Sequence, residues 1–341
     1  MKPSFLGTFG LVFAAIAALF AVDMFLAKVE RSETAAQAAR LYKKGEQLAA
    51  AGRYNEAVTS LRDALAISRD NATWQLALGN ALLSAGKLDD AESLLRDLLQ
   101  RDATNGEGNL LMARALARQQ RIAVAESYYH MAIYGRWPRD ADANRIRARF
   151  ELIDLLVKVD AKQQLLAELL PLQDEPLTDP ATRARIARLF LLAGSPARAA
   201  DLFRQILHHQ RQDADAYAGL GEAEFARGNY PTAESILVVA LRLKPGDAQV
   251  RKDLELCDEV VGLDPTPRGL TPAARFARSR KLVQALLEDA GKCNLPATVR
   301  AGATTDANLA AADKLWQARK ASCPGTPPDP AVVIVMDKIA E

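Results

Sequence analysis

A period of 34 residues is the feature that most constrains how this chain can fold. Units of this length start at residues 38, 72 and 106. After a six-residue insertion at 140–145, the same period resumes with units starting at 146, 180 and 214. A fixed period of this size is typical of a solenoid, in which one supersecondary unit is copied and stacked on its neighbours. The period therefore predicts a stack of similar units.

Small residues and glycines recur at fixed positions of these units. Position fifteen holds Gly52, Gly86, Gly194 and Gly228, where a helix can end in the left-handed conformation that glycine adopts without a Cβ penalty. Positions eight and twenty hold small residues, which would let the two helices of a unit pack closely. These predicted packing residues are Gly45, Ala57, Gly79, Ala91, Ala113, Ala125, Ala187, Ala199, Gly221 and Ala233.

The unit starting at residue 146 departs from this pattern. It carries Ile153 and Leu165 at positions eight and twenty, and Asp160 at position fifteen. Three interpretations stay open: splayed helices, a bend between two blocks of repeats, or a degenerate linking repeat.

Composition predicts an all-α chain. Hydrophobic residues make up 49% of the sequence but aromatic residues only 6%, and the abundant Ala and Leu favour helices. Outside 331–336, Val and Ile form no run of the kind that indicates a strand.

The repeats resemble the tetratricopeptide repeat. The resemblance covers about 38–247, with a partial helix to 261, and residues 214–247 are the cleanest copy, with Tyr217, Leu220, Gly221, Tyr230 and Pro245. It implies pairs of antiparallel helices wound into a right-handed superhelix with a concave inner face. We expect three repeats in a first block at 38–139. A second block at 140–261 would hold the degenerate repeat, two regular repeats and one further helix.

The resemblance also implies which residues line the inner face, namely those at positions two, five, nine, twelve and thirteen. A net basic middle stretch could bind a peptide carboxylate or an acidic segment through bidentate arginine contacts, although a solvated helical face is the alternative. Tyr42 and Glu46 do not match the carboxylate clamp of chaperone-binding relatives. The predicted groove residues are Tyr42, Asn80, Arg114, Arg118, Arg147, Phe150, Lys158, Arg188 and Phe225.

The N-terminal segment predicts a membrane anchor. Residues 5–22 carry no charge, and a helix over 5–27 would rise about 34 Å, enough to cross a hydrocarbon core about 30 Å thick. A cleaved signal peptide and a buried core helix are the alternatives. The four-residue tail at 1–4 favours an exported, periplasmic domain, whereas the Lys and Arg residues after the apolar run favour the cytoplasmic side.

The C-terminal region predicts a helical hairpin over 270–323 that covers the last repeat, followed by a flexible tail at 324–341. Residues 262–269 break the preceding helix, and Thr271 and Pro272 would start the next one. Cys293 and Cys323 could form a disulfide only if the helices pack differently from a simple hairpin, and Cys257 is an alternative partner.

No pattern in the sequence indicates chemistry. The 44 basic and 42 acidic side chains give a net charge of +2, without the basic face that nucleic acid requires. We find no spacing typical of a catalytic, cofactor, metal or small-molecule site among the residues, which include three histidines and three cysteines. The sequence thus favours a membrane-anchored scaffold that binds a protein or peptide, in envelope assembly, secretion or complex maturation. A structural subunit of a larger membrane complex is the alternative, and a redox enzyme using the cysteines is disfavoured.

Overall fold

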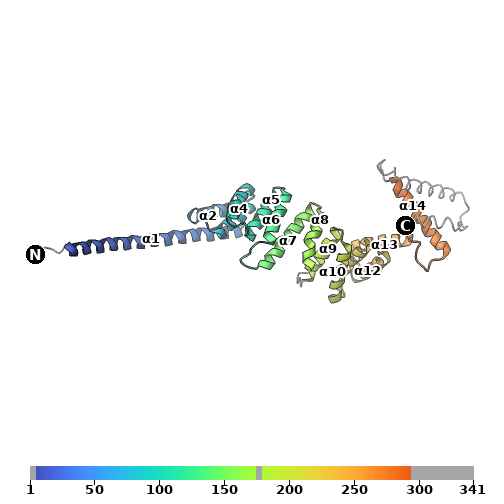
Figure 1. Ribbon diagram of the computed structural model, residues 1–341. Helices are drawn as coiled ribbons and strands as arrows, with labels where there is room; N and C mark the ends of the chain where they lie inside the picture. Colours follow the sequence, from blue (N-terminus) through green and yellow to red (C-terminus); the bar gives the residue numbers. More distant parts are fainter. Residues whose placement is uncertain (1–4, 174–178, 293–341) are drawn as a thin grey trace. The chain divides into compact units, whose positions relative to one another are not determined.

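The computed structural model describes residues 5–173 and 179–292, and the protein is helical throughout these residues (Figure 1). The chain divides into two compact units, Met1–Glu168 and Leu169–Glu341, and each is described by itself. This division differs from the predicted boundary at residue 140. The repeat that follows the insertion lies almost entirely in the first unit.

The first unit holds the first four helix pairs, and α8 ends one residue beyond it. The second unit holds a short 3-10 helix, η1, followed by the next two pairs and two further helices. The helices of the first four pairs are α1 (Phe5–Ala50), α2 (Tyr54–Ile67), α3 (Ala72–Ser84), α4 (Leu88–Arg101), α5 (Gly106–Arg118), α6 (Ile122–Ile133), α7 (Ala141–Lys158) and α8 (Lys162–Leu169). Those that follow are η1 (Leu170–Gln173), α9 (Pro180–Leu192), α10 (Pro196–His209), α11 (Ala214–Ala226), α12 (Tyr230–Leu243), α13 (Ala248–Leu263) and α14 (Pro272–Lys292).

Two helix boundaries differ from the predicted ones. Helix α1 runs without a break from Phe5 to Ala50, so the predicted anchor and the first helix of the first repeat are one helix. Helix α7 starts at Ala141 and has 18 residues, so most of the insertion at 140–145 forms the first turn of that helix. The reason is local, because residues 141–145 contain neither glycine nor proline and continue into a strong helical pattern.

The same capping chemistry starts the first helix of several pairs. The side chains of Asn71, Asn105, Asp179, Asp213 and Asp247 precede these helices and accept hydrogen bonds from backbone N–H groups of the first turn. Each cap satisfies donors that would otherwise have no partner within the helix. This repeated cap explains why helices start at Ala72, Gly106, Pro180 and Ala214, as the period predicts.

Position fifteen takes the left-handed conformation in every one of the six units. Gly52, Gly86, Gly194 and Gly228 have φ between 73° and 80°. The remaining two units place Gln120 (φ 62°) and Asp160 (φ 53°) there. The tight turn between paired helices therefore requires this backbone conformation even where no glycine supplies it.

In the first, second and sixth pairs, the close approach of the helices depends on the glycine at position eight and on the leucine at position twenty-four, which faces it. A Cβ on Gly45 would lie 2.6 Å from Leu61 Cγ, and one on Gly221 would lie 2.6 Å from Leu237 Cγ. Gly79 is less tight, with the nearest atom of Leu95 at 3.1 Å. The alanines at positions eight and twenty are fully buried, and in the fourth repeat Ile153 and Leu165 fill this space and are buried too.

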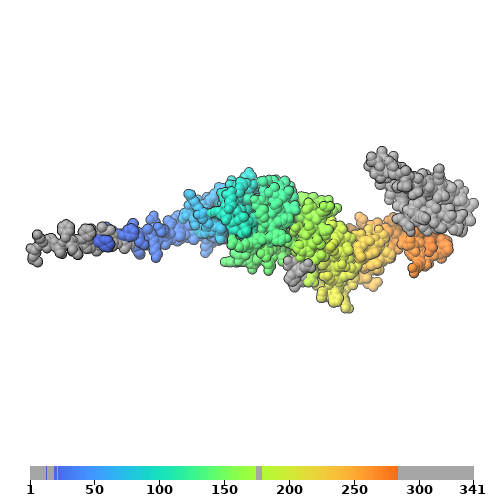
Figure 2. All heavy atoms as spheres, viewed as in Figure 1, coloured from blue at the N-terminus to red at the C-terminus, as the bar shows by residue number. Residues whose placement is uncertain are grey.

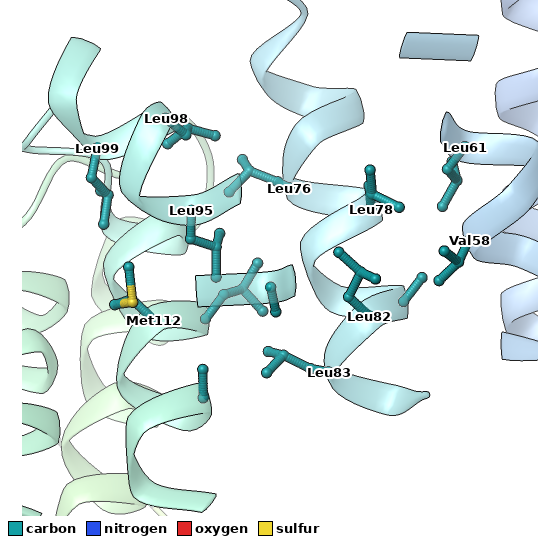
Figure 3. Close-up of a cluster of buried hydrophobic side chains, with 14 of the residues drawn as sticks. Val58, Leu61, Leu76, Leu78, Leu82, Leu83, Leu95, Leu98, Leu99 and Met112 are labelled. Atoms are coloured by element: carbon teal, nitrogen blue, oxygen red, sulfur yellow. The ribbon is translucent and has the colours of Figure 1, made fainter. Parts of the chain in front are cut away.

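Leucines from successive pairs form a continuous core in the first unit. Figure 3 shows Leu61, Leu82, Leu95 and Met112 pointing into one cluster from neighbouring helices. A solenoid is stabilised in this way because each pair buries the face that its neighbour leaves open.

Backbone hydrogen bonds and a buried tryptophan fix the connection between α6 and α7. The Arg136 backbone N–H donates to the Thr104 carbonyl oxygen at 2.7 Å, and the Gly106 N–H donates to the Arg136 carbonyl oxygen at 3.0 Å. The buried Trp137 indole donates to the Ala132 carbonyl oxygen at 2.9 Å and packs against Gly106, where a Cβ would lie 2.5 Å from the ring. The segment before the insertion is thus tied back to the start of α5.

The predicted anchor, disulfide, C-terminal hairpin and tail include residues that the structure does not describe. Among the described residues, no helix is both long and apolar enough to cross a membrane. The side chains of 5–12, 14–18 and 21, within the predicted anchor, are outside the described residues, and the anchor stays a prediction. Cys293, Cys323, the second helix of the predicted hairpin and the tail at 324–341 are also outside them. Helix α14 does start as predicted, with the Thr271 hydroxyl accepting from the Ala274 N–H.

The contact between positions eight and twenty-four predicts a non-additive pair of mutations. Gly221→Ala should lower the free energy of unfolding by about 1 kcal/mol, because overpacking of about 1–3 kcal/mol outweighs the helix propensity that alanine gains. Leu237→Ala should cost about 2–5 kcal/mol by leaving a cavity. The double variant should be more stable than the sum by about 1–2 kcal/mol, because the new methyl group fills part of that cavity. Thermal and denaturant unfolding measure all three, with Gly79→Ala as the milder comparison; strict additivity would contradict this contact.

The left-handed turns predict opposite effects for two exchanges at position fifteen. Gln120→Gly should stabilise the chain by about 0.5–1 kcal/mol, because a non-glycine residue pays about 1–2 kcal/mol in this conformation and glycine pays less than that in chain entropy. Gly194→Ala should destabilise it by about 1 kcal/mol for the same reason. Denaturant titration gives both values, and equal signs for the two variants would refute the explanation.

Candidate functional site

The first helices of consecutive pairs place most of the predicted groove residues on one surface of the first unit. We call the surface formed by α1, α3, α5 and α7 the inner-helix surface. Helix α3 packs against both α1 and α5, and an ion pair joins α5 to α7. The inner-helix surface is lined by Tyr42, Asn80, Arg114, Arg118, Arg147, Phe150 and Lys158.

An aromatic pair forms the part of this surface that belongs to the first two repeats. The Tyr42 and Trp74 rings stack with centroids 5.1 Å apart and an interplanar angle of 13°. The Tyr42 hydroxyl donates to Glu46 Oε1 at 2.6 Å. Desolvation raises the pKa of Tyr42 to about 12, with further contributions from Glu46 and from Glu107 on α5. Tyr42 is thus a neutral, oriented ring, and Trp74, which the positional rule did not select, is its partner.

Arg114 does not offer a free guanidinium, which corrects its predicted role. Its Nε and Nη2 donate to the two oxygens of Glu151 at 2.8 Å and 2.6 Å, a bidentate pair between α5 and α7. This hydrogen bonding raises the pKa of Arg114 further, against desolvation. Because the planar fork is already satisfied, Arg114 fixes one repeat to the next. Glu151 was missed because its position in the repeat is not among those that line the inner face.

Three cations of the inner-helix surface remain exposed. Arg118 donates one N–H to the Leu83 carbonyl oxygen at 2.7 Å, and the residue as a whole is exposed. Arg147 and Lys158 are exposed on α7, and within the described part of the chain they form no ion pair. Arg118 and Lys158 both occupy position thirteen of their repeats. Phe150 is half-buried, and it lies between Arg147 and Lys158 in the sequence of α7.

Arg188 and Phe225 belong to the second unit, so they are described apart from the inner-helix surface. Arg188 is exposed on α9. Desolvation and the nearby Asp253 on α13 raise the pKa of Glu222 on α11, and the attraction of Arg188 opposes this shift only in part. Phe225 packs edge-to-face on Tyr230, with ring centroids 5.1 Å apart.

Two carboxylates that sequence reasoning did not select, one buried and one half-buried, act in packing. Glu224 is almost fully buried and pairs with Arg204 and Arg227, while Asn229 Nδ2 donates to it at 2.6 Å. Glu168 lies 3.0 Å from His130 Nε2 and 3.7 Å from Arg149 Nε. His130 therefore bridges α6 and α8 and lies in the last turn of α6. Each carboxylate satisfies cations from neighbouring helices, as a buried charge requires.

No group of three or more metal-ligating side chains occurs in residues 5–173 and 179–292. Cys257 is buried there as a free thiol, and desolvation raises its pKa to about 11. A thiol of this kind is a poor nucleophile at neutral pH.

The tetratricopeptide repeat family matches residues 48–115, 82–134 and 190–253. The fold is similar to that of YrrB, described as a TPR protein with an unusual peptide-binding site (17% identity, 57% of this chain and 97% of that chain, TM-score 0.44). It is also similar to the C-terminal part of a TPR repeat-containing protein from Cytophaga hutchinsonii (14%, 70% and 93%, TM-score 0.49). A third is PilW, described as a widely conserved type IV pilus biogenesis factor (19%, 64% and 98%, TM-score 0.42). At these values the three structures carry no argument about binding. No curated protein matches the chain.

Tyr129, which is buried on α6 and interacts electrostatically with Glu151 and Arg114, predicts a loss of stability at alkaline pH. Desolvation raises the pKa of its phenol from 10.0 to about 12. The folded state thus retains a proton that the unfolded state releases, and stability present below pH 10 is lost as pH rises towards about 12. The loss is at most about 3 kcal/mol from this group, at about 1.4 kcal/mol per pKa unit. Denaturant unfolding of Tyr129→Phe across this range should show a shallower decline than the wild type, and a decline of the same slope would contradict the assignment.

Proposed function

The chain is a tetratricopeptide repeat protein, and on this basis we propose that it binds a protein partner through the inner-helix surface of its first unit. Repeats of this family generally form a binding scaffold without catalytic activity. We assign no chemical step to any residue, and the partner is a protein or peptide.

The observation that carries this proposal is the set of exposed cations Arg118, Arg147 and Lys158 beside an arginine that is already paired. An acidic segment or a terminal carboxylate would complement these three charges, and charge-assisted hydrogen bonds to carboxylates are among the stronger polar contacts. Glu151 neutralises Arg114, so fewer residues attract an acidic partner than the sequence predicts. Arg118 and Lys158 also lie in the last turn of their helices, where a cation favours the helix dipole by about 0.3–1 kcal/mol. A binding test must therefore be accompanied by an unfolding measurement.

We further propose that the chain is held at a membrane by α1, with the repeats on the extracytoplasmic side. Support for the anchor comes from the uncharged run at 5–22 and from the exposed side chains that the structure describes at the end of this run and just beyond it. Leu19, Phe20, Met24, Phe25 and Leu26 are all well exposed. At about 100° per residue they point to every side of the helix, whereas a partner helix would cover only one side. A lipid environment suits such a helix.

The binding proposal is tested by charge reversal at two positions. Arg147→Glu combined with Lys158→Glu should remove from affinity captures the partners that the wild-type chain retains, and increasing salt should weaken those same partners. Arg69→Glu, at an exposed site between the first two repeats, is the matched control and should capture the wild-type set.

The outcome against the proposal is an unchanged set of captured proteins in the double variant, with both variants unfolding at the wild-type temperature. Partners that stay at fixed stoichiometry in mild detergent, whatever these charges are, would instead favour the alternative of a structural subunit in a larger membrane complex.

A further inference from the structure

We infer that α1 is a rigid stalk that holds the inner-helix surface close to the bilayer, so that the partner is an acidic segment next to the membrane-spanning part of another membrane-anchored protein. This inference rests on the proposed function, because it needs both the anchor in the membrane and the basic inner-helix surface.

First, helix α1 is continuous from the apolar segment into the first repeat. The helix has 46 residues from Phe5 to Ala50, and residues 11–44 contain neither glycine nor proline. The described side chains at 28–37 are all exposed, and the segment is rich in charged residues and alanine, which suits a solvated helix. Figure 2 shows this part of α1 leading into the repeats with no other described segment over it on the visible face. Nothing in this stretch marks a hinge, since sharp kinks need proline, glycine or an inserted group.

The second step is the attachment of α1 to the repeats. Ala38 is fully buried, Gly45 lies directly under Leu61, and Tyr42 stacks on Trp74 of the next repeat. Helix α1 therefore contributes the first helix of the first repeat and cannot rotate independently of it. The orientation of residues 5–27 in the membrane therefore also determines the orientation of the inner-helix surface, because no flexible linker separates the two.

The third step is the height of the surface. Tyr42 lies 15 residues beyond Ala27, the end of the apolar segment, which corresponds to about 22 Å along a helix at 1.5 Å per residue. The headgroup layer occupies about 5–8 Å of this distance on each side of the hydrocarbon core. An average tilt of about 20° changes this height little. The edge of the inner-helix surface is thus within reach of an extended segment of about seven residues, at about 3.3 Å per residue, that leaves the same bilayer.

The fourth step is the choice of partner. Two proteins fixed in one bilayer meet at a high effective concentration, but only when the tether of each matches the height of the other's site. A stalk that cannot bend makes this match strict. The exposed cations Arg118, Arg147 and Lys158 then select acidic residues in that membrane-proximal segment.

The test uses the full chain in phosphatidylcholine nanodiscs, with a photocrosslinking residue in place of the exposed Asn80. The probe is a lipid-anchored peptide that ends in six glutamates, with spacers of 3, 7, 14 and 28 residues, and the same peptide without a lipid. We expect crosslinking to be greatest near the seven-residue spacer and at least about tenfold above the free peptide at equal concentration.

Duplication of residues 28–34 keeps the helix phase and lengthens α1 by about 10 Å, so the best spacer should grow by about three residues. Replacing residues 31–34 with four glycines keeps the length and should flatten the dependence on spacer.

The outcomes separate the stalk from the proposed function. If saturating free peptide crosslinks and Lys158→Glu abolishes this, but the wild-type yield is the same for every spacer, the rigid stalk is refuted and the binding function stands. A best spacer that the duplication does not move also refutes it. If no form of the peptide crosslinks, or the chain does not enter nanodiscs, the proposed function fails and the inference fails with it. The spacer series on the chain of natural length needs only the exchange at the exposed Asn80, so misfolding of the duplicated chain would leave the test decisive.

Discussion

The close contact between a glycine at position eight and a leucine at position twenty-four is the constraint on which the first and sixth helix pairs depend. Gly45 and Gly221 leave no room for a side chain beside Leu61 and Leu237. A larger residue would separate the two helices of the pair, and interiors packed to crystal-like density do not absorb such a change cheaply. The left-handed residue at position fifteen determines the turn between the two helices of each pair, because it reverses the chain direction within very few residues.

Polar groups then link one pair to the next. Arg114 joins α5 to α7 through Glu151, His130 and Arg149 meet at Glu168, and Glu224 gathers cations from two helices. Each of these side chains could have been a binding group by residue type alone. Pairing with carboxylates neutralises the arginines among them, so the surface has less unpaired positive charge than a count of arginines suggests. Binding by such a surface depends on a few residues, which is the usual distribution of energy at protein interfaces.

The continuity of α1 connects the repeats to the N-terminal segment in a way that changes what the inner-helix surface can do. A flexible linker would let the repeats search a large volume, whereas one helix keeps the first repeat at a constant distance from the apolar segment. The same residues thus contribute to packing, through Ala38 and Gly45, and to position, through the exposed stretch before them.

The sequence by itself determined the all-α repeat fold, because the period, the glycines and the buried alanines report local geometry that every copy must satisfy. It predicted the helix starts at Ala72, Gly106, Pro180 and Ala214. It did not reveal that Gln120 takes the glycine conformation, because neighbouring contacts and not residue preference impose that φ. Only the tertiary structure decided which cations stay exposed, since Arg114 and Glu151 are 37 residues apart and meet only when the repeats stack. It also decided that α1 is unbroken, because no local signal distinguishes a spacer from a helix when the surrounding residues favour helix.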